Sequence, residues 1–210
     1  MKPKVIVNVA MSADGKIALP DRSEVKISGE EDFKRVHELR NDVDAILVGI
    51  GTVLADDPKL TVKDGFVENP EHPLKVVLDS KSRIPKDSKL FRDGDFLIAT
   101  TKKVDQDGWI KCGDGDKVDL SKLMNVLEDR GIKSVLVEGG GEVIYSFFKE
   151  KLVDEYYVFV GSVVIGGKNS PSPADGVGAR DIDDIISLKL YDHQTLDDGV
   201  LLKYRVEYDD

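Results

Sequence analysis

Short apolar runs alternate with amphipathic segments along the first two thirds of the chain. The runs are rich in valine, isoleucine and leucine, and turn-forming residues follow each of them. They predict strands at 5–10, 44–49, 74–79, 95–101 and 134–137. Apolar residues at helical spacing, together with residues typical of helix ends, predict helices over 29–41, 120–130 and 142–151.

The order of these segments indicates the fold class. Alternating strands and helices favour an α/β fold with a largely parallel sheet. Two late strands, 155–165 and 199–208, have no convincing helix between them, so we expect an antiparallel C-terminal edge. Residues 61–73 and 166–180 read as loops. Because no repeat, low-complexity tract or linker interrupts the chain, we expect one domain over 1–210.

The first predicted helix has a capping signal at its start and two polar residues beside its apolar stripe. Ser28 and Glu31 match a capping box, with Ser28 as the N-cap. Arg40 and His37 lie on the flank of the stripe, which consists of Phe33, Val36, Leu39 and Val43. A guanidinium there needs a bound anion, an acidic neighbour or a route to water. We interpret His37 as a structural histidine.

Composition and charge narrow the function classes. The 210-residue chain is 40% hydrophobic and 33% charged, with a formal net charge of −10. Such a surface repels nucleic acid and anionic membrane, and no apolar run is long enough to span a bilayer. A single cysteine, Cys112, cannot form an internal disulfide, so we expect a cytoplasmic protein. A phosphorylated ligand would require a locally basic cleft.

Unusual residues gather where predicted strands end. The segments are Gly49–Thr52, Asp79–Arg83, Thr100–Lys103 and Glu138–Gly141. In open α/β sheets ligands bind at the carboxyl ends of the strands. Gly139, Gly140 and Gly141 join a strand to a helix, where backbone N–H groups can approach an anion closely. We favour phosphate binding over a flexible connector, although the sequence matches neither the dinucleotide fingerprint nor a P-loop.

Two further groups of residues fit a phosphorylated cofactor. The turn Ser80, Lys81, Ser82 and Arg83 offers two hydroxyls and two cations, which suit the 2′-phosphate that distinguishes NADPH from NADH. An ordinary solvated turn is the alternative. Thr52 and Asp56 lie one helical turn apart after a glycine turn. They either reach into the same cleft or serve as a cap and a surface acid.

Several catalytic chemistries find no support in the sequence. Three histidines and one cysteine form no zinc-deaminase pattern and no metal-ligand spacing, so we expect no metal. A nucleophile elbow is absent. These exclusions favour chemistry that a bound cofactor carries.

The motifs resemble the reductases of riboflavin biosynthesis. The resemblance spans 4 to about 166 and rests on NVAMSADGKIA at 8–18, LR at 39–40, DAILVG at 44–49, TVLADDPKLTV at 52–62, VVLDS at 76–80 and VEGGG at 137–141. This family includes the reductase half of the bifunctional bacterial deaminase–reductase and free-standing archaeal and fungal enzymes. It implies a dihydrofolate-reductase-like fold with helices on both faces of the sheet, NADPH as cofactor and a homodimer.

The resemblance also implies roles for individual residues. The NADPH site would include Thr52, Asp56, Ser80 and the segment from Gly139 to Glu142, and the substrate side would include Arg40, Leu60 and Glu138. Arg40 would lie near the substrate phosphate. Lys63 stands where bacterial relatives carry an arginine, which keeps the charge but loses the bidentate fork.

The implied reaction reduces the sugar of a phosphorylated ribosylaminopyrimidine to a ribityl chain through an imine. Glu138 is our first candidate for stabilising the cationic imine or relaying a proton, and Asp14 is the second. A tight turn is the alternative for Asp14 and Gly15. The substrate is either the diamino or the deaminated pyrimidine, and a free-standing enzyme favours the diamino compound. Rival functions are another NADPH reductase, such as a dihydrofolate reductase, and a non-catalytic NADPH sensor.

Overall fold

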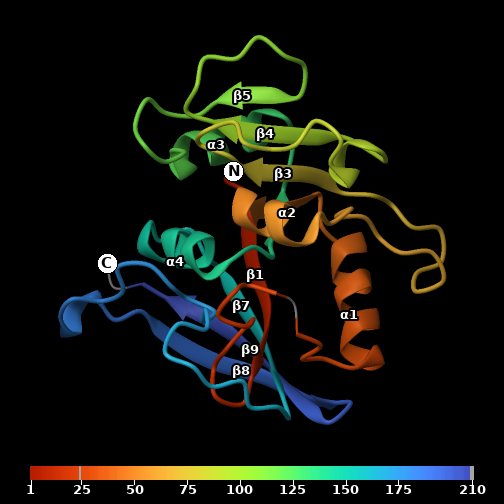
Figure 1. Ribbon diagram of the computed structural model, residues 1–210, viewed down its shortest axis with the longest axis vertical. Helices are drawn as coiled ribbons and strands as arrows, with labels where there is room; N and C mark the ends of the chain where they lie inside the picture. The colour runs from red at the N-terminus through yellow and green to blue at the C-terminus, as the bar shows by residue number, and fades with distance from the viewer. Residues whose placement is uncertain (24, 209–210) are drawn as a thin grey trace. The chain divides into compact units, whose positions relative to one another are not determined.

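A computed structural model describes residues 1–23 and 25–208 (Figure 1). The chain divides into two compact units, each assembled from separate segments. Unit 1 contains residues 1–4 and 36–139, and unit 2 contains 5–35 and 140–210. One boundary falls between Gly139 and Gly140, inside the glycine segment noted above.

Unit 1 is built on five parallel strands in the order β5-β4-β3-β2-β6. Their bounds are β2 (Ala45–Gly49), β3 (Leu74–Leu78), β4 (Phe96–Thr100), β5 (Trp109–Lys111) and β6 (Ser134–Val137). The central strand β2 is buried along its whole length. Continuous burial explains why these strands read as apolar runs rather than as alternating patterns.

Two helices connect strands within unit 1. Helix α2 (Ile50–Asp56) leads from β2 to β3, and α3 (Leu120–Asp129) leads from β5 to β6. The two connections run in opposite directions along the strand order, so right-handed crossovers place the helices on opposite faces. Figure 1 shows α2 in front of these strands and α3 behind them. A short 3₁₀ helix, Lys89–Phe91, lies between β3 and β4.

Unit 2 combines parallel and antiparallel pairing in the order β1-β7-β9-β8. The strands are β1 (Lys4–Ser12), β7 (Glu155–Gly161), β8 (Ser187–Leu196) and β9 (Gly199–Glu207). β1 and β7 are parallel, whereas β7, β9 and β8 form an antiparallel meander. Helix α4 (Gly141–Lys149) contributes Phe148, whose ring packs edge-on against Tyr156 of β7 at 5.2 Å.

The predicted fold class is confirmed: the structure is α/β, mostly parallel, with an antiparallel C-terminal edge. Two strands were missed. β5 has only three residues, too few to produce a pattern. β8 is exposed along almost its whole length, so no burial pattern marks it in the sequence. No described helix is long and apolar enough to cross a membrane.

Helix α1 (Glu30–Asn41) begins differently from the prediction. The predicted N-cap, Ser28, lies two residues before the first helical residue. Instead, the carboxylate of Asp197 accepts hydrogen bonds from the amides of Glu31 and Asp32 at 3.2 and 3.1 Å. In return Glu31 accepts from the Asp197 amide at 3.0 Å. A residue more than 160 positions away therefore caps this helix, which local sequence cannot reveal.

The buried face of α1 also differs from the predicted apolar stripe. Phe33 is 45% exposed, whereas Asp32 and His37 are buried. The buried charge of Asp32 is balanced by Arg35, whose Nε donates to it at 2.8 Å and whose Nη2 donates to Asn8 at 2.9 Å. Polar pairing thus allows an ionisable residue to occupy a buried position on this helix.

We expect Asp197→Ala to lower the free energy of unfolding by about 1–2 kcal/mol, because it removes the cap of α1. Ser28→Ala is the matched control and should change stability by less than about 0.5 kcal/mol. Urea denaturation of the two variants measures both values. A larger loss of stability in Ser28→Ala than in Asp197→Ala would show that Ser28 is the N-cap, as the sequence predicts.

Candidate functional site

An ion pair joins the last turn of α1 to the residue that follows β6. Arg40 Nη2 lies 2.8 Å from Glu138 Oε2, and Arg40 Nε donates to both carboxylate oxygens at 3.1 and 3.2 Å. The side chains are 19% and 9% exposed. Glu138 is held in place by its own amide, which donates to Leu47 of β2 at 3.0 Å. The pair therefore joins two separate segments of unit 1.

Burial and pairing act in opposite directions on Arg40. Burial disfavours the charged guanidinium, but the neighbouring Glu138 carboxylate outweighs it and raises the pKa of Arg40. Bidentate contact between a guanidinium and a carboxylate is a strong, directional form of hydrogen bond. The anionic partner that the sequence required for Arg40 is thus an acidic neighbour within the protein.

The segment 60–63 is fastened to the same helix. Thr61 accepts a hydrogen bond on its carbonyl from Arg40 Nη1 at 3.3 Å, and the Lys63 amide donates to His37 Nδ1 at 3.1 Å. Leu60, 3% exposed, has a left-handed backbone with φ of 53°. A leucine rarely adopts that conformation unless its surroundings enforce it. The segment is therefore a rigid part of the site.

His37 is a buried, neutral histidine in this cluster. Its ring stacks on Phe66 with centroids 5.3 Å apart and planes 11° apart. Burial lowers the pKa of His37 to about 4, and the charges of Arg40 and Lys63 act in the same direction against the opposing effect of Glu138. Because Nδ1 accepts from Lys63, the ring proton is on Nε2.

Four residues predicted for the substrate side thus meet in unit 1. Arg40 contacts Glu138 directly, and it also contacts the segment that carries Leu60 and Lys63. Sequence analysis placed His37 on the same flank as Arg40 but assigned it no contact with the segment 60–63. The spacing between positions 37 and 40 was the available signal, because residues three apart lie on one face of a helix.

The glycine segment packs tightly rather than forming an open loop. A Cβ on Gly139 would lie 2.7 Å from the backbone of Val48 and Gly49, at the end of β2. In unit 2, a Cβ on Gly141 would lie 2.4 Å from the Ser172 carbonyl oxygen. Close backbone packing therefore requires glycine at both positions, whatever they bind. Glu142 is exposed in the first turn of α4.

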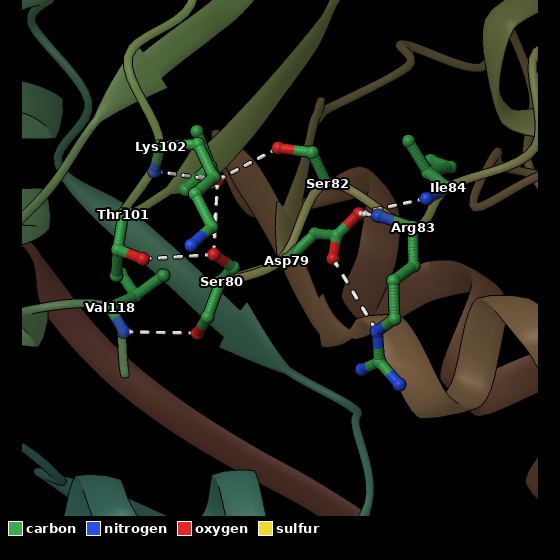
Figure 2. Close-up of polar contacts among 9 residues, drawn as sticks. Asp79, Ser80, Ser82, Arg83, Ile84, Thr101, Lys102 and Val118 are labelled. Atoms are coloured by element: carbon green, nitrogen blue, oxygen red, sulfur yellow. Dashed lines mark hydrogen bonds and ion pairs between the residues drawn. The ribbon is translucent and has the colours of Figure 1, made fainter. Parts of the chain in front are cut away.

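The turn after β3 is tied to the end of β4. Thr101 Oγ1 donates to the Ser80 carbonyl at 2.9 Å, and the Val118 amide donates to Ser80 Oγ at 3.2 Å (Figure 2). Ser82 Oγ lies 3.0 Å from the hydroxyl of Thr100. Parallel neighbours β3 and β4 end at the same edge, which explains how the predicted segments 79–83 and 100–103 come together.

Asp79 holds the backbone of this turn through its side chain. Its buried carboxylate accepts hydrogen bonds from the amides of Arg83 and Ile84 at 2.5 and 2.8 Å. Its other oxygen lies 3.9 Å from Arg83 Nε (Figure 2). Ser82 has a left-handed φ of 55°, and Lys81, Arg83 and Lys102 are exposed around it. The turn therefore presents cations on a fixed backbone.

The remaining predicted residues lie on α2 and after β1. Thr52 and Asp56 are one turn apart on α2, as expected. In unit 2, Asp14 accepts hydrogen bonds from Ser12 Oγ at 2.6 Å and from the amides of Ile165 and Gly166 at 3.0 and 2.7 Å. These donors, Ser12 first, lower the pKa of Asp14 to about 2. Asp14 is thus a carboxylate that anchors a loop.

Comparison with known proteins defines the class first and then the family. The fold is that of dihydrofolate reductase: the Enterococcus faecalis enzyme superposes with a TM-score of 0.58 at 11% identity, over 98% of this chain and 97% of that one. Residues 3–202 match the model of the RibD C-terminal domain. The chain belongs to the RibD C-terminal domain family.

Relatives in this family cover nearly the whole chain. A protein of Archaeoglobus fulgidus is 40% identical over 192 residues, which are 84% of this chain and 88% of the relative. One of Methanothermobacter thermautotrophicus is 37% identical over 216 residues, 99% of this chain and all of the relative. Both are named 2,5-diamino-6-ribosylamino-4(3H)-pyrimidinone 5′-phosphate reductase. The riboflavin biosynthesis reductase Rib7 of Saccharomyces cerevisiae superposes with a TM-score of 0.78 at 26% identity, covering 98% and 90% of the two chains.

We expect Gly139→Ala to destabilise the protein by about 1–3 kcal/mol, because its Cβ would press on the backbone of Val48 and Gly49. Gly115→Ala is the matched control, since no atom lies within 4 Å of its Cβ position. Thermal denaturation measures both. Equal melting temperatures of the two variants would show that the backbone at the end of β2 can shift to accommodate the Cβ without loss of stability.

Acid should destabilise the protein through His37. The pKa of His37 is about 4 in the folded state against 6.5 for an ordinary histidine, so the unfolded chain binds more protons between these values. This contribution is complete above pH 6.5 and is lost as the pH falls towards about 4, with a total of about 1–3 kcal/mol. Urea unfolding between pH 7 and 4.5 measures the slope. His37→Asn should reduce the dependence of the free energy of unfolding on pH. An unchanged dependence would show that His37 does not cause the loss of stability in acid.

Proposed function

We propose that this chain reduces the ribosylamino group of 2,5-diamino-6-ribosylamino-4(3H)-pyrimidinone 5′-phosphate to a ribitylamino group in riboflavin biosynthesis. The observation that carries the proposal is the cluster of Arg40, Glu138 and the segment 60–63 at the end of β6. It unites a carboxylate with basic side chains, as a phosphorylated sugar imine requires. The relatives named for this reaction span the same length of chain.

The cofactor that we propose is NADPH, which supplies the hydride when bound. The turn after β3 suits its 2′-phosphate, because Lys81 and Arg83 are exposed beside two hydroxyls that fix the backbone. We assign the rest of the cofactor site to Thr52, Asp56, Gly139, Gly140, Gly141 and Glu142. Ser80 and Ser82 complete the turn.

Arg40 has the capacity to bind the substrate as well as Glu138. A guanidinium has five N–H donors, and the contacts with Glu138 and Thr61 use three of them. Two remain for an oxygen of the substrate phosphate or sugar. Lys63, on the segment that begins at Leu60, adds an exposed cation. We assign the substrate phosphate to Arg40 and Lys63.

Glu138 is the residue that we assign to the reacting centre. Its carboxylate lies 2.8 Å from Arg40 at the end of β6, and we favour direct electrostatic stabilisation of the cationic imine by this group over proton relay. Asp14 is a second, weaker candidate: its pKa of about 2 suits a fixed negative charge and not a proton donor.

We further propose a homodimer in the cytoplasm, where the buried thiol of Cys112 stays reduced.

A turnover assay tests the function. The protein is mixed with NADPH or NADH and, separately, with the diamino or the deaminated ribosylaminopyrimidine phosphate, and mass spectrometry detects the gain of two hydrogens. We expect the diamino compound and NADPH to be preferred. Reduction of the deaminated compound alone would mean that deamination comes before reduction in the pathway. Binding of NADPH without reduction of either compound would favour a sensor, and reduction of dihydrofolate would favour the rival reductase.

Glu138→Gln should lower kcat at least about 100-fold, because a neutral amide cannot offset the positive charge of the imine. The dissociation constant of NADPH, measured by fluorescence titration, should change less than about threefold. Glu68→Gln, at an exposed position, is the control for general effects of losing a carboxylate. An unchanged kcat would remove Glu138 from the mechanism.

A further inference from the structure

We propose that His37 is a positioning residue that sets the place of Lys63 in the substrate site. The inference rests on the proposed function, because it assigns a partner to the cation that would face the substrate phosphate. It also explains why a polar, ionisable side chain occupies a buried position on α1. A histidine that served packing alone would need no acceptor atom directed at the segment 60–63.

The first support is a two-point attachment of that segment. His37 and Arg40 lie three residues apart, on one face of α1. Arg40 holds the carbonyl of Thr61, and His37 holds the amide of Lys63. Val62 between them is 2% exposed. The backbone on both sides of Val62 is thus fixed by side chains of one helix.

The second support is a contact that reaches the Lys63 side chain. Phe66 stacks on the His37 ring, and Lys63 Nζ lies over the Phe66 ring, 5.4 Å from its centroid. A cation held over an aromatic face loses part of its rotational freedom. His37 therefore acts on Lys63 twice, through its backbone amide and through the position of Phe66.

The protonation state of His37 suits this task. Nδ1 can accept from Lys63 only while it is unprotonated, and burial together with the nearby charges of Arg40 and Lys63 keeps the ring neutral at physiological pH. Glu138, which opposes this effect, is itself paired with Arg40. The hydrogen bond that holds the Lys63 backbone is therefore present at physiological pH, where a phosphate group is charged.

His37→Leu and His37→Asn form a matched pair for the test. Both side chains are of similar size, but only asparagine places an acceptor oxygen near the position of Nδ1. Hydrogen exchange of the Lys63 amide, followed by NMR, should accelerate about tenfold or more in His37→Leu and much less in His37→Asn. Equal exchange in all three proteins would overturn the inference, whether or not the protein is a reductase.

Kinetics with the diamino substrate provide the second measurement. In His37→Leu we expect KM to rise about five- to tenfold while kcat and the NADPH dissociation constant change less than about threefold. His37→Asn should recover most of the loss. In a Lys63→Ala background, His37→Leu should raise KM by a smaller factor, because the two residues act together.

The failures of the two proposals are distinguishable. If the wild-type protein reduces neither pyrimidine, the proposed function fails, while Lys63 exchange still tests the contact. If the wild type is active and Lys63→Ala leaves KM unchanged, the role of His37 in substrate binding is wrong. An equal KM increase from His37→Leu with and without the Lys63 side chain would also contradict it.

Discussion

The ion pair between Arg40 and Glu138 is the interaction on which the site in unit 1 depends. It connects the end of α1 to the end of β6, and the same guanidinium reaches the segment 60–63. Because the pair is mostly buried, removing either partner leaves the charge of the other without its counterion. The proposed substrate side of the site is therefore organised by an electrostatic contact and not by apolar packing alone.

Much of the fold was predictable because the inner strands are buried on both faces. Continuous apolar runs marked β2, β3, β4 and β6, although β3 also carries Lys75, whose buried ammonium donates to the carbonyl of Leu90 at 2.6 Å. A pattern of hydrophobicity cannot foresee a charged residue that is satisfied by distant carbonyls. It also failed for β8, where exposure leaves no contrast between the two faces.

Candidate site residues could be proposed from the sequence, but the contacts between them could not. Positions at strand ends pointed to Glu138 and the turn at 80–83, and the flank of an apolar helix stripe pointed to Arg40. The partners are separated by 98 positions in the ion pair, by 26 in the His37–Lys63 contact and by 166 in the bond between Glu31 and Asp197. Such contacts depend on the tertiary arrangement, on which a single sequence carries no direct signal.

The division of the chain has a consequence for its synthesis on the ribosome. Unit 1 draws almost all of its residues from one continuous stretch, 36–139, so its five strands can assemble as soon as that stretch has emerged. Unit 2 has its first strand near the amino terminus, whereas β7, the parallel partner of that strand within the unit, begins at Glu155. Nascent β1 therefore cannot pair with β7 until more than half of the remaining chain has been synthesised.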